Sequence, residues 1–338
     1  MNQPARGVIV AVCDLDGHPV PDWVTQTLTQ AGIDLRVRQC TTQDELSEHA
    51  RDAEIVWLFG GSRLLHGGTL AKLPKCRAIV RTGSGTDNVP VDEATERGIV
   101  VANTPAALSD AVSDHVIALL FAMVRHVPRM DRLVRSGVFD QNLGRPINLI
   151  QGRTFGLVGF GHIARAVLRK LRGFEMTWLV HDPYVSESTL VAHGARPAAL
   201  DEVLSESDFV SLHCPLTPQT RHLIGERELR LMKPEAVLVN AARGAVVDEP
   251  VLIRALQEKW IAAACLDAFE QEPLPVDSPL FQLENVILAP HSASQTAEGM
   301  EPRWRASVDA VLALASHHWP PSCVNRQVQP AQPLTLPS

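Results

Sequence analysis

The chain has 338 residues, 45% hydrophobic and 20% charged, which is ordinary for a globular protein and enough for about two domains. Its net charge of −7 and the lack of a Lys/Arg run give no electrostatic basis for binding nucleic acid. No apolar stretch is long enough to cross a bilayer, and residues 1–14 lack the basic segment and apolar core of a secretory signal. We therefore expect neither a nucleic acid nor a membrane as a partner.

The cysteines are scattered, without a C-x-x-C pair or a His/Cys cluster of metal-ligand spacing. This pattern favours free thiols in a cytoplasmic protein and predicts no metal site. The cysteines are Cys13, Cys40, Cys76, Cys214, Cys265 and Cys323.

The N-terminal part of the chain alternates between short apolar runs and segments with helical spacing of apolar residues, which predicts a small α/β domain with a parallel sheet. Glycine-rich loops, Gly60–Arg63 and Gly83–Asn88, follow the third and fourth runs, where open α/β sheets bind their ligands. Plain turn chemistry explains either loop equally well when it is taken alone. The expected strands are 7–13, 33–38, 55–59, 78–81 and 99–101, and the expected helices are 21–31, 43–50, 68–73 and 91–97.

The segment Asn103–Pro105 interrupts this alternation, and a long helical pattern follows it to Val124. We interpret this pattern as the passage from a first domain into a second. Residues 128–150 are interrupted by Gly137 and Gly144 and are expected to be irregular. An arm of this kind, placed before a nucleotide-binding fold, often packs on a partner subunit.

The segment from Thr154 to Asp182 has the order of a dinucleotide-binding βαβ unit: strand, glycine turn, helix, strand and acid. Gly159 permits the tight turn, and Gly161 lets a pyrophosphate approach the positive end of a helix. Asp182 is placed to accept hydrogen bonds from a ribose, and its charge repels the 2′-phosphate of NADP, so NAD is the expected cofactor. The competing interpretation of the glycines alone is an ordinary turn in an α/β domain.

Further apolar runs after Asp182 complete a doubly wound sheet whose ligand loops follow the strand ends. Residues 294–316 have helical spacing and are expected to return to the first domain. The polar, proline-containing tail after residue 325 is expected to be disordered. The expected strands are 208–213, 236–240, 261–266 and 286–289, and the expected helices are 199–205, 226–231 and 249–257.

The ends of three of these strands bring together one arginine, one histidine and several carboxylates. Hydride transfer to a 2-keto acid needs such a set: a guanidinium binds the carboxylate and polarises the ketone, an imidazole passes a proton, and a carboxylate orients the imidazole. Taken singly, Arg243 is equally well a surface residue, His291 a core histidine and Glu272 a solvated acid.

Four segments resemble signature blocks of the D-isomer-specific 2-hydroxyacid dehydrogenases, the family of phosphoglycerate, glyoxylate/hydroxypyruvate and D-lactate dehydrogenases. The segments are RTGSGTDNV (81–89), VNAARGAVVDE (239–249), ACLDAFEQEP (264–273) and LAPHSASQT (288–296). The resemblance extends over residues 50–315. The GSG, HDPY and HCPLTPQT motifs are most similar to the branch that contains phosphoglycerate dehydrogenase and the NAD-dependent co-repressor called C-terminal binding protein.

The resemblance implies an α/β fold with two doubly wound parallel-sheet domains, in which a Rossmann-type cofactor domain is inserted into a flavodoxin-like substrate domain. The substrate domain is expected at 1–103 plus 293–325, the NAD-binding domain at 104–292, and a disordered tail at 326–338. Members of the family are commonly dimers, so a homodimer is expected.

The resemblance also assigns residue roles. Arg243 is similar to the substrate-binding arginine, His291 to the acid/base, and Glu272 to its carboxylate partner. The cofactor residues implied are Gly159, Gly161, His162, Ile163, Asp182, His213, Cys214, Pro215, Thr220, Ala241, Ala242, Arg243, Asp267 and His291. The substrate-binding residues implied are Gly61, Ser62, Arg63, Ser84, Gly85, Arg243 and His291.

The expected activity is therefore that of an NAD-dependent oxidoreductase, which transfers hydride between NAD(H) and a small 2-keto acid or D-2-hydroxy acid. The alternative is an NAD(H)-sensing scaffold of the co-repressor type, with incidental dehydrogenase activity. The sequence leaves the substrate's side group open. The loop Gly60–Arg63 departs from relatives that often place a charged or polar residue directly after the strand, and it hints at a polar or anionic group, phosphate and phosphonate included.

Overall fold

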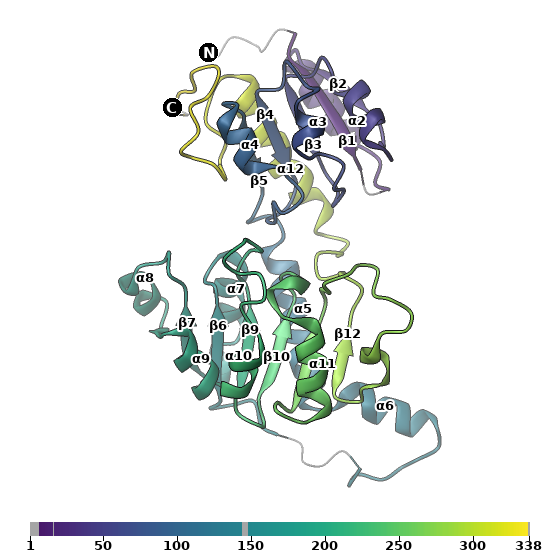
Figure 1. The fold of residues 1–338 in the computed structure, drawn as a ribbon, viewed down its shortest axis with the longest axis vertical. Helices are drawn as coiled ribbons and strands as arrows, with labels where there is room; N and C mark the ends of the chain where they lie inside the picture. Colours follow the sequence, from purple (N-terminus) through teal and green to yellow (C-terminus); the bar gives the residue numbers. More distant parts are fainter. Residues whose placement is uncertain (1–6, 16, 144–147, 337–338) are drawn as a thin grey trace. The chain divides into compact units, whose positions relative to one another are not determined.

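The computed structural model describes residues 7–15, 17–143 and 148–336, and the chain divides into two compact units (Figure 1). Unit 1 consists of Met1–Leu108 and Ala297–Ser338, and unit 2 of Ser109–Thr296. Unit 1 is thus discontinuous in sequence. The chain passes between the units somewhat later than the boundaries that were expected after residues 103 and 292.

Unit 1 contains a sheet of five parallel strands in the order β2-β1-β3-β4-β5. The inner strands consist mostly of buried aliphatic residues, because helices cover both faces of a parallel sheet. The strand order is that of flavodoxin-like doubly wound folds. The strands are β1 (Ile9–Asp14), β2 (Asp34–Val37), β3 (Ile55–Leu58), β4 (Ala78–Arg81) and β5 (Val100–Asn103).

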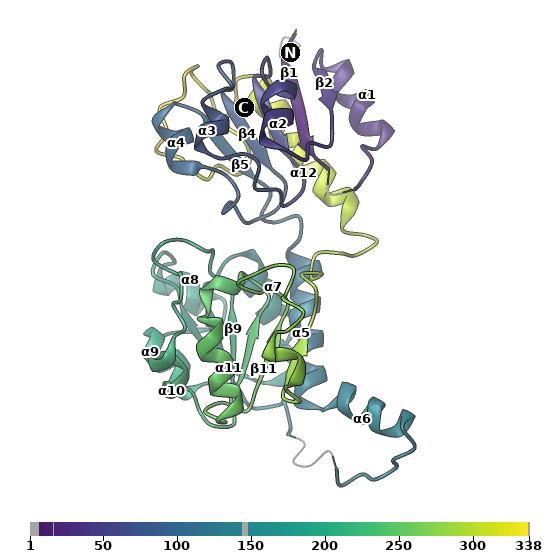
Figure 2. The ribbon, with the colours of Figure 1, turned by 45° about the vertical axis from the view of Figure 1, so that its right-hand side comes forward.

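One helix of unit 1 comes from the far end of the sequence and packs on this sheet (Figures 1 and 2). This helix is α12, Met300–Ala315, and its Trp304 ring stacks on Phe59 with 3.9 Å between the ring centroids. It begins at Met300 rather than at residue 294, because residues 292–296 form turns. The other helices are α1 (Asp22–Gln30), α2 (Gln43–His49), α3 (Gly67–Leu70) and α4 (Val91–Glu96).

The C-terminal segment runs along the sheet edge at β5, which corrects the expectation of a disordered tail for residues 326–336. Val324 donates its N–H to the carbonyl of Val101 at 2.8 Å, and the fully buried Asn325 accepts the Val101 N–H at 2.8 Å. Val328 is buried in the core of unit 1. Backbone groups of an edge strand and one buried amide hold this segment, and composition alone does not reveal such contacts.

Unit 2 contains a sheet of seven parallel strands in the order β12-β11-β10-β9-β6-β7-β8. The direction in which strands are added reverses between β6 and β9, which is the switch point where Rossmann-type sheets bind dinucleotides. The predicted fold class, two doubly wound parallel sheets, is confirmed. The strands are β6 (Thr154–Val158), β7 (Thr177–His181), β8 (Arg196–Pro197), β9 (Phe209–Leu212), β10 (Val237–Asn240), β11 (Ala263–Leu266) and β12 (Val286–Leu288).

Helix α6, Val127–Arg135, stands away from the sheet of unit 2 (Figures 1 and 2). It corrects the expectation that residues 128–150 are irregular, at least as far as Arg135. A proline occupies its first turn, where the missing N–H has no intrahelical partner to lose, and Asp131 pairs with Arg135 at 2.9 Å.

The other helices of unit 2 are α5 (Ser109–Val124), α7 (His162–Lys170), α8 (Glu187–Ala192), α9 (Leu200–Glu206), α10 (Glu226–Leu231) and α11 (Glu249–Gln257). Within the described ranges, no single helix is long and apolar enough to span a membrane, and α5 and α6 meet that test only as a pair bent by 59°.

Candidate active site

The strands of unit 2 end at one edge of the sheet, because all of them are parallel. The loops that leave this edge carry the cofactor and catalytic residues that were predicted for this domain. Strands β6 and β9 flank the switch point, and the loops after them are in backbone contact: a Cβ on Gly159 would lie 2.8 Å from the nitrogen of Cys214.

The glycine turn after β6 has the geometry that a dinucleotide requires. Gly159 has φ of 94°, which favours glycine, and the close approach of Cys214 leaves no room for a side chain. Gly161 is the N-cap residue of α7, where no side chain caps the helix, and a Cβ there would meet nothing within 4 Å. The chain therefore leaves the space beside Gly161 open at the N-terminus of a helix, and the turn fits a pyrophosphate.

Asp182 follows β7 and lies beside this turn. Its Oδ2 accepts the N–H of Phe160 at 2.7 Å, and its Oδ1 accepts the N–H of Tyr184 at 2.9 Å. The two backbone donors fix the carboxylate without using all of its acceptor capacity, so it remains able to bind ribose hydroxyls. Next to Gly161, His162 is exposed and Ile163 is half-buried.

The loop after β9 is closed by Thr220, whose hydroxyl donates to the carbonyl of Pro215 at 2.6 Å and accepts the Thr217 N–H at 2.8 Å. Burial lowers the pKa of His213 to about 4, so its ring is neutral at physiological pH. Its Nε2 is buried and has no hydrogen-bond partner among the described residues. Burial also raises the pKa of the Cys214 thiol to about 11, which makes it an inert thiol rather than a nucleophile.

The loop after β10 presents Arg243. The buried Asn240 donates to the Arg243 carbonyl at 2.9 Å and accepts the Ala242 N–H at 3.1 Å, which fixes the backbone on both sides of Ala242. A Cβ on Gly244 would lie 1.8 Å from the carbonyl carbon of Phe269. The arginine loop and the loop that carries Glu272 are therefore in backbone contact, which requires glycine at this position.

His291 and Glu272 form a hydrogen-bonded pair at the same edge. The Nδ1 atom of His291 lies 2.8 Å from Oε2 of Glu272, and Oε1 of Glu272 accepts the Phe269 N–H at 3.0 Å. Burial works to raise the pKa of Glu272, but the His291 hydrogen bond, the Phe269 N–H and the charges of His291 and Arg243 outweigh it, and the pKa lies below its ordinary value. Glu272 is therefore a carboxylate at neutral pH.

Asp267 follows β11 and is 1% exposed. Its two oxygens accept the N–H groups of Ser292 and Ala293 at 2.8 and 3.0 Å, and Nε2 of His115 lies 3.3 Å from Oδ1. Burial would raise the pKa of Asp267, but these contacts lower it, so the acid is ionised. His115 was not predicted from the sequence. It is a lone imidazole on the apolar helix α5. Because it lies far from Asp267 in the sequence, no motif or spacing connects the two residues.

Unit 1 has its own pair of loops at strand ends, after β3 and β4. The buried Asp14 accepts the Ser62 N–H at 2.8 Å, and a Cβ on Gly60 would lie 2.5 Å from the same carboxylate. Asn88 donates to the Ser62 carbonyl at 2.9 Å and accepts from Nε of Arg81 at 3.1 Å. Asp14 and Asn88 thus hold the backbone of the first loop, a role that the sequence analysis did not find.

The predicted substrate residues of unit 1 lie on these two loops. Arg63 is 78% exposed, and its guanidinium lies 3.8 Å from the Asp87 carboxylate on the second loop. Gly61 has open space around its Cβ position. Ser84 is exposed, Gly85 is half-buried, and the Ser84 carbonyl accepts the side-chain amide of Asn103 at 2.9 Å.

Comparison with known proteins agrees with this geometry. The family model described as "D-isomer specific 2-hydroxyacid dehydrogenase, NAD binding domain" matches residues 117–293. A glyoxylate reductase of Korarchaeum cryptofilum is 44% identical over 263 residues, which cover 77% of this chain and 79% of that protein. The chain belongs to the D-isomer specific 2-hydroxyacid dehydrogenase family. It is an oxidoreductase, a D-2-hydroxyacid dehydrogenase that uses a nicotinamide cofactor.

Two solved structures show the same fold as this dehydrogenase. A glyoxylate reductase of Paecilomyes thermophila has a TM-score of 0.86 and 28% identity, covering 95% of this chain and 99% of its own. An NADPH-dependent glyoxylate/hydroxypyruvate reductase of Sinorhizobium meliloti, in complex with NADP and malonate, has a TM-score of 0.81 and 28% identity, covering 97% and 99%.

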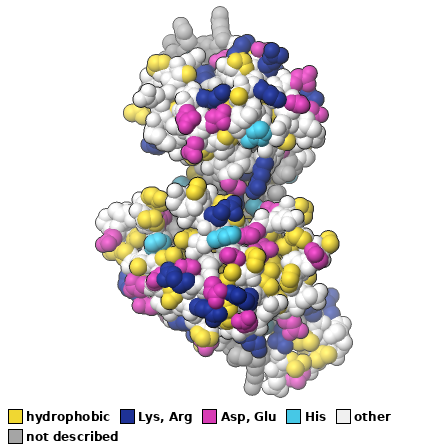
Figure 3. Space-filling model, in the orientation of Figure 1, with side chains coloured by type: hydrophobic (Ala, Val, Ile, Leu, Met, Phe, Trp, Pro, Cys, Tyr) yellow, Lys and Arg dark blue, Asp and Glu magenta, His cyan; other side chains and the backbone are white. Residues whose placement is uncertain are grey.

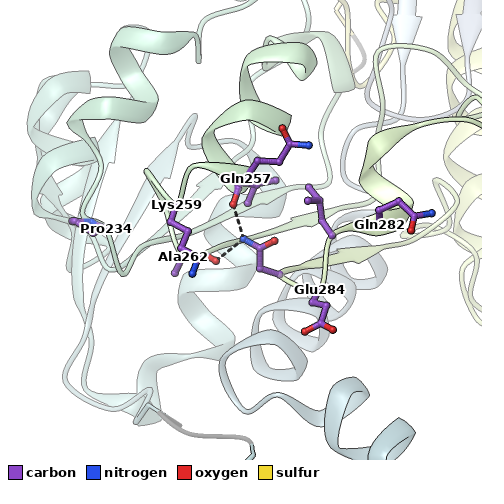
Figure 4. A pocket seen from close by; sticks show the side chains of 9 residues that line it. Pro234, Gln257, Lys259, Ala262, Gln282 and Glu284 are labelled. Carbon is purple, nitrogen blue, oxygen red and sulfur yellow. Dashed lines mark hydrogen bonds between the residues drawn. The ribbon is translucent and has the colours of Figure 1, made fainter.

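A surface pocket of unit 2 lies away from the cofactor and catalytic residues described above (Figure 4). It has a volume of about 620 Å³ and is found where β11 and β12 begin, at the opposite edge of the sheet from His291. Asn285 at this pocket donates to the carbonyls of Leu256 and Ala262 at 3.2 and 3.0 Å, so it ties the end of α11 to the start of β11. We therefore assign this pocket a structural role and no part in the reaction.

Proposed function

We propose that this dehydrogenase reduces a small 2-keto acid, with glyoxylate as the first candidate, to the corresponding 2-hydroxy acid, and that it also catalyses the reverse reaction. The observation that carries the proposal is the His291–Glu272 pair, with 2.8 Å between Nδ1 and Oε2, at the same sheet edge as Arg243 and the glycine turn. The names of similar proteins support the substrate class, since both a sequence relative and a solved structure are glyoxylate reductases.

In this proposal, bound NAD(H) supplies or accepts the hydride. His291 donates a proton from Nε2 to the keto oxygen during reduction and takes it back during oxidation. Glu272 engages Nδ1, so it fixes the orientation of the ring and leaves Nε2 for proton transfer. Reduction therefore uses the charged imidazole and oxidation the neutral one, and the two directions have opposite dependences on pH.

Arg243 binds the substrate carboxylate and draws electron density from the keto group. Its backbone is fixed by Asn240, so the guanidinium starts from a rigid loop. From unit 1, the backbone of Ser84 and Gly85 and the loop Gly61–Arg63 are assigned to the substrate on the family resemblance.

We propose NAD rather than NADP as the cofactor. The carboxylate of Asp182 is held in place by two backbone N–H groups, at 2.7 and 2.9 Å, and its charge disfavours a 2′-phosphate at the adenosine ribose. The reductase of Sinorhizobium meliloti was solved with NADP, so the family includes members that bind NADP. In this chain, Asp182 after β7 supports NAD.

We also propose a homodimer in which the arm after α5 packs on a second copy of the chain. Helix α6 has no buried residue, and the side chains after it include Phe139, which is 93% exposed. Hydrophobic side chains lie on the surface of this arm (Figure 3). Their exposure in one chain supports an apolar interface rather than a solvated end. Each cysteine is a free thiol, which fits the proposed cytoplasmic location.

The test is NADH and NADPH oxidation against a panel of 2-keto acids, among them glyoxylate, hydroxypyruvate, pyruvate and phosphorylated analogues. We expect turnover with NADH and one or more small acids, and a dimer by light scattering with and without NADH. No turnover with any acid, together with NADH-dependent assembly, would contradict the enzyme and favour the NAD(H)-sensing scaffold.

A further inference from the structure

The backbone of the proposed acid/base residue is in an unfavourable conformation. His291 has φ of 51°, in the left-handed region that non-glycine residues rarely adopt. A backbone of this kind persists only where the surrounding contacts hold it. The structure therefore has to contain groups that fix the chain directly beside His291.

Asp267 supplies these contacts. The N–H groups of Ser292 and Ala293, the two residues after His291, donate to its two carboxylate oxygens at 2.8 and 3.0 Å. The acid is 1% exposed and lies directly at the end of β11, so it is a rigid acceptor for both donors. One buried carboxylate thus clamps the turn in which His291 takes its left-handed conformation.

His115 supports this carboxylate from α5. Its Nε2 lies 3.3 Å from Oδ1 of Asp267, and its side chain is 24% exposed. The two backbone N–H groups already supply hydrogen bonds to the buried carboxylate, and Nε2 of His115 is itself buried and has no regular hydrogen bond within the described part of the chain, so what His115 adds is a close polar contact with Oδ1. Helix α5 begins at Ser109, where unit 2 begins, so the imidazole is carried by the first two turns of the helix that opens this unit.

We propose that His115 is a positioning residue, which acts through Asp267 to hold the backbone of His291 in the conformation that catalysis requires. The inference rests on the proposed function in that His291 is taken as the acid/base. It adds a structural role for Asp267 besides the cofactor contact that the family resemblance implies. Each carboxylate oxygen accepts more than one hydrogen bond, so the two roles are compatible.

The first experiment is hydrogen exchange by mass spectrometry on the full-length protein without cofactor, and it does not depend on activity. His115→Leu removes the imidazole at similar volume, and His115→Gln keeps an N–H donor of similar reach. We expect exchange in a peptide containing Ser292 and Ala293 to be at least about tenfold faster in His115→Leu, with little change elsewhere in unit 2. His115→Gln should restore most of the protection.

A matched control is His49→Leu in unit 1, which removes another half-buried imidazole, hydrogen-bonded at 3.1 Å to the carbonyl of Val12. It should leave exchange at residues 289–296 unchanged. The proposal is overturned if His115→Leu exchanges like the wild type at these residues. It is also overturned if the acceleration is spread evenly over unit 2, since that pattern marks a general loss of stability.

The second experiment separates positioning of His291 from binding of the cofactor. In His115→Leu we expect kcat for the preferred keto acid to fall about 30- to 100-fold, because small misplacements of a catalytic group have effects of this size. The Kd for NADH, measured by fluorescence, should change by less than about threefold, and the solvent isotope effect on kcat should rise, because proton transfer has become slower. A parallel loss of NADH binding with an unchanged isotope effect would overturn the proposal.

If the wild type has no turnover at all, the proposed function fails, and the exchange experiment still decides the role of His115.

Discussion

The carboxyl edge of the sheet in unit 2 and the glycine-rich loops of unit 1 are both built where parallel strands end, but they hold their polar groups differently. In unit 2, the acids Glu272 and Asp267 accept backbone N–H groups and contact histidines directly. In unit 1, the buried Asp14 accepts the Ser62 N–H of its loop and the side-chain amide of Gln39, and Arg63 is exposed, with an ion pair to Asp87 at 3.8 Å. The comparison indicates that the carboxylates beside the proton-transfer group are held by the backbone and also contact a histidine. The exposed Arg63, which is assigned to substrate recognition, can adapt its position to the substrate.

The largest expected effect compares the two regions directly. His291→Ala should lower kcat by about 10³-fold, within the usual range for loss of a general acid/base, and leave the Kd for NADH nearly unchanged. Arg63→Ala should change kcat by less than about threefold and act mainly on KM, because an exposed side chain with a long ion pair is not part of a fixed geometry. Steady-state kinetics with the preferred keto acid measure both. Equal losses of kcat in the two variants would contradict the distinction between the regions.

The next effect concerns the cofactor end of unit 2. Asp182→Asn keeps an amide oxygen for the N–H of Phe160 but removes the charge. We expect the preference for NADH over NADPH, as a ratio of kcat/KM, to fall by about 10- to 100-fold, or about 1.4 to 2.7 kcal/mol. Glu187→Gln is the control, because it removes an exposed charge from the first turn of α8. An unchanged ratio in Asp182→Asn would refute the electrostatic basis of NAD selection.

The sequence predicted the edge of unit 2 better than the loops of unit 1, for a physical reason. Gly159, Gly161 and Asp182 lie within one βαβ unit, so their spacing along the chain carries the geometry. His291 and Arg243 follow strands of the same parallel sheet, which brings them to one edge in any such fold. Local pattern and sheet topology were therefore sufficient to place these residues together.

What was not predicted depends on contacts that sequence spacing does not encode. His115 and Asp267 are brought together by the packing of α5 on the sheet, and Asp14 meets Ser62 only once β1 and β3 are paired. The C-terminal segment is held by Asn325 and the edge of β5 rather than by a hydrophobic pattern. Helix α6 ends at Arg135, before the glycines that suggested an irregular arm, and the pairing of Asp131 with Arg135 supports it.

A smaller effect tests how unit 1 holds its loop. Gly60→Ala should destabilise the protein by about 1 to 3 kcal/mol, because the new methyl group would lie 2.5 Å from the Asp14 carboxylate. Gly61→Ala is the matched control: its methyl group meets nothing within 4 Å, and we expect a change within about 0.5 kcal/mol. Urea unfolding of both variants measures the difference. Equal destabilisation would show that Asp14 does not define this loop.

The smallest expected effect is on the acid stability of unit 2. The pKa of Glu272 in the folded chain lies below its ordinary value, so its ionised form adds stability at neutral pH, and this is lost as the pH falls through that lowered pKa. Because the side chain is 38% exposed, we expect Glu272→Gln to cost no more than about 1 kcal/mol at pH 7 and nothing well below pH 4. Glu249 is the opposite case, since burial raises its pKa, so Glu249→Gln should be neutral or stabilising at pH 7. Urea unfolding from pH 3 to pH 8 distinguishes the two acids. If both variants lose stability in parallel, the His291–Glu272 pair contributes no more to the free energy of unfolding than Glu249 does. Glu272 would then serve only to orient His291.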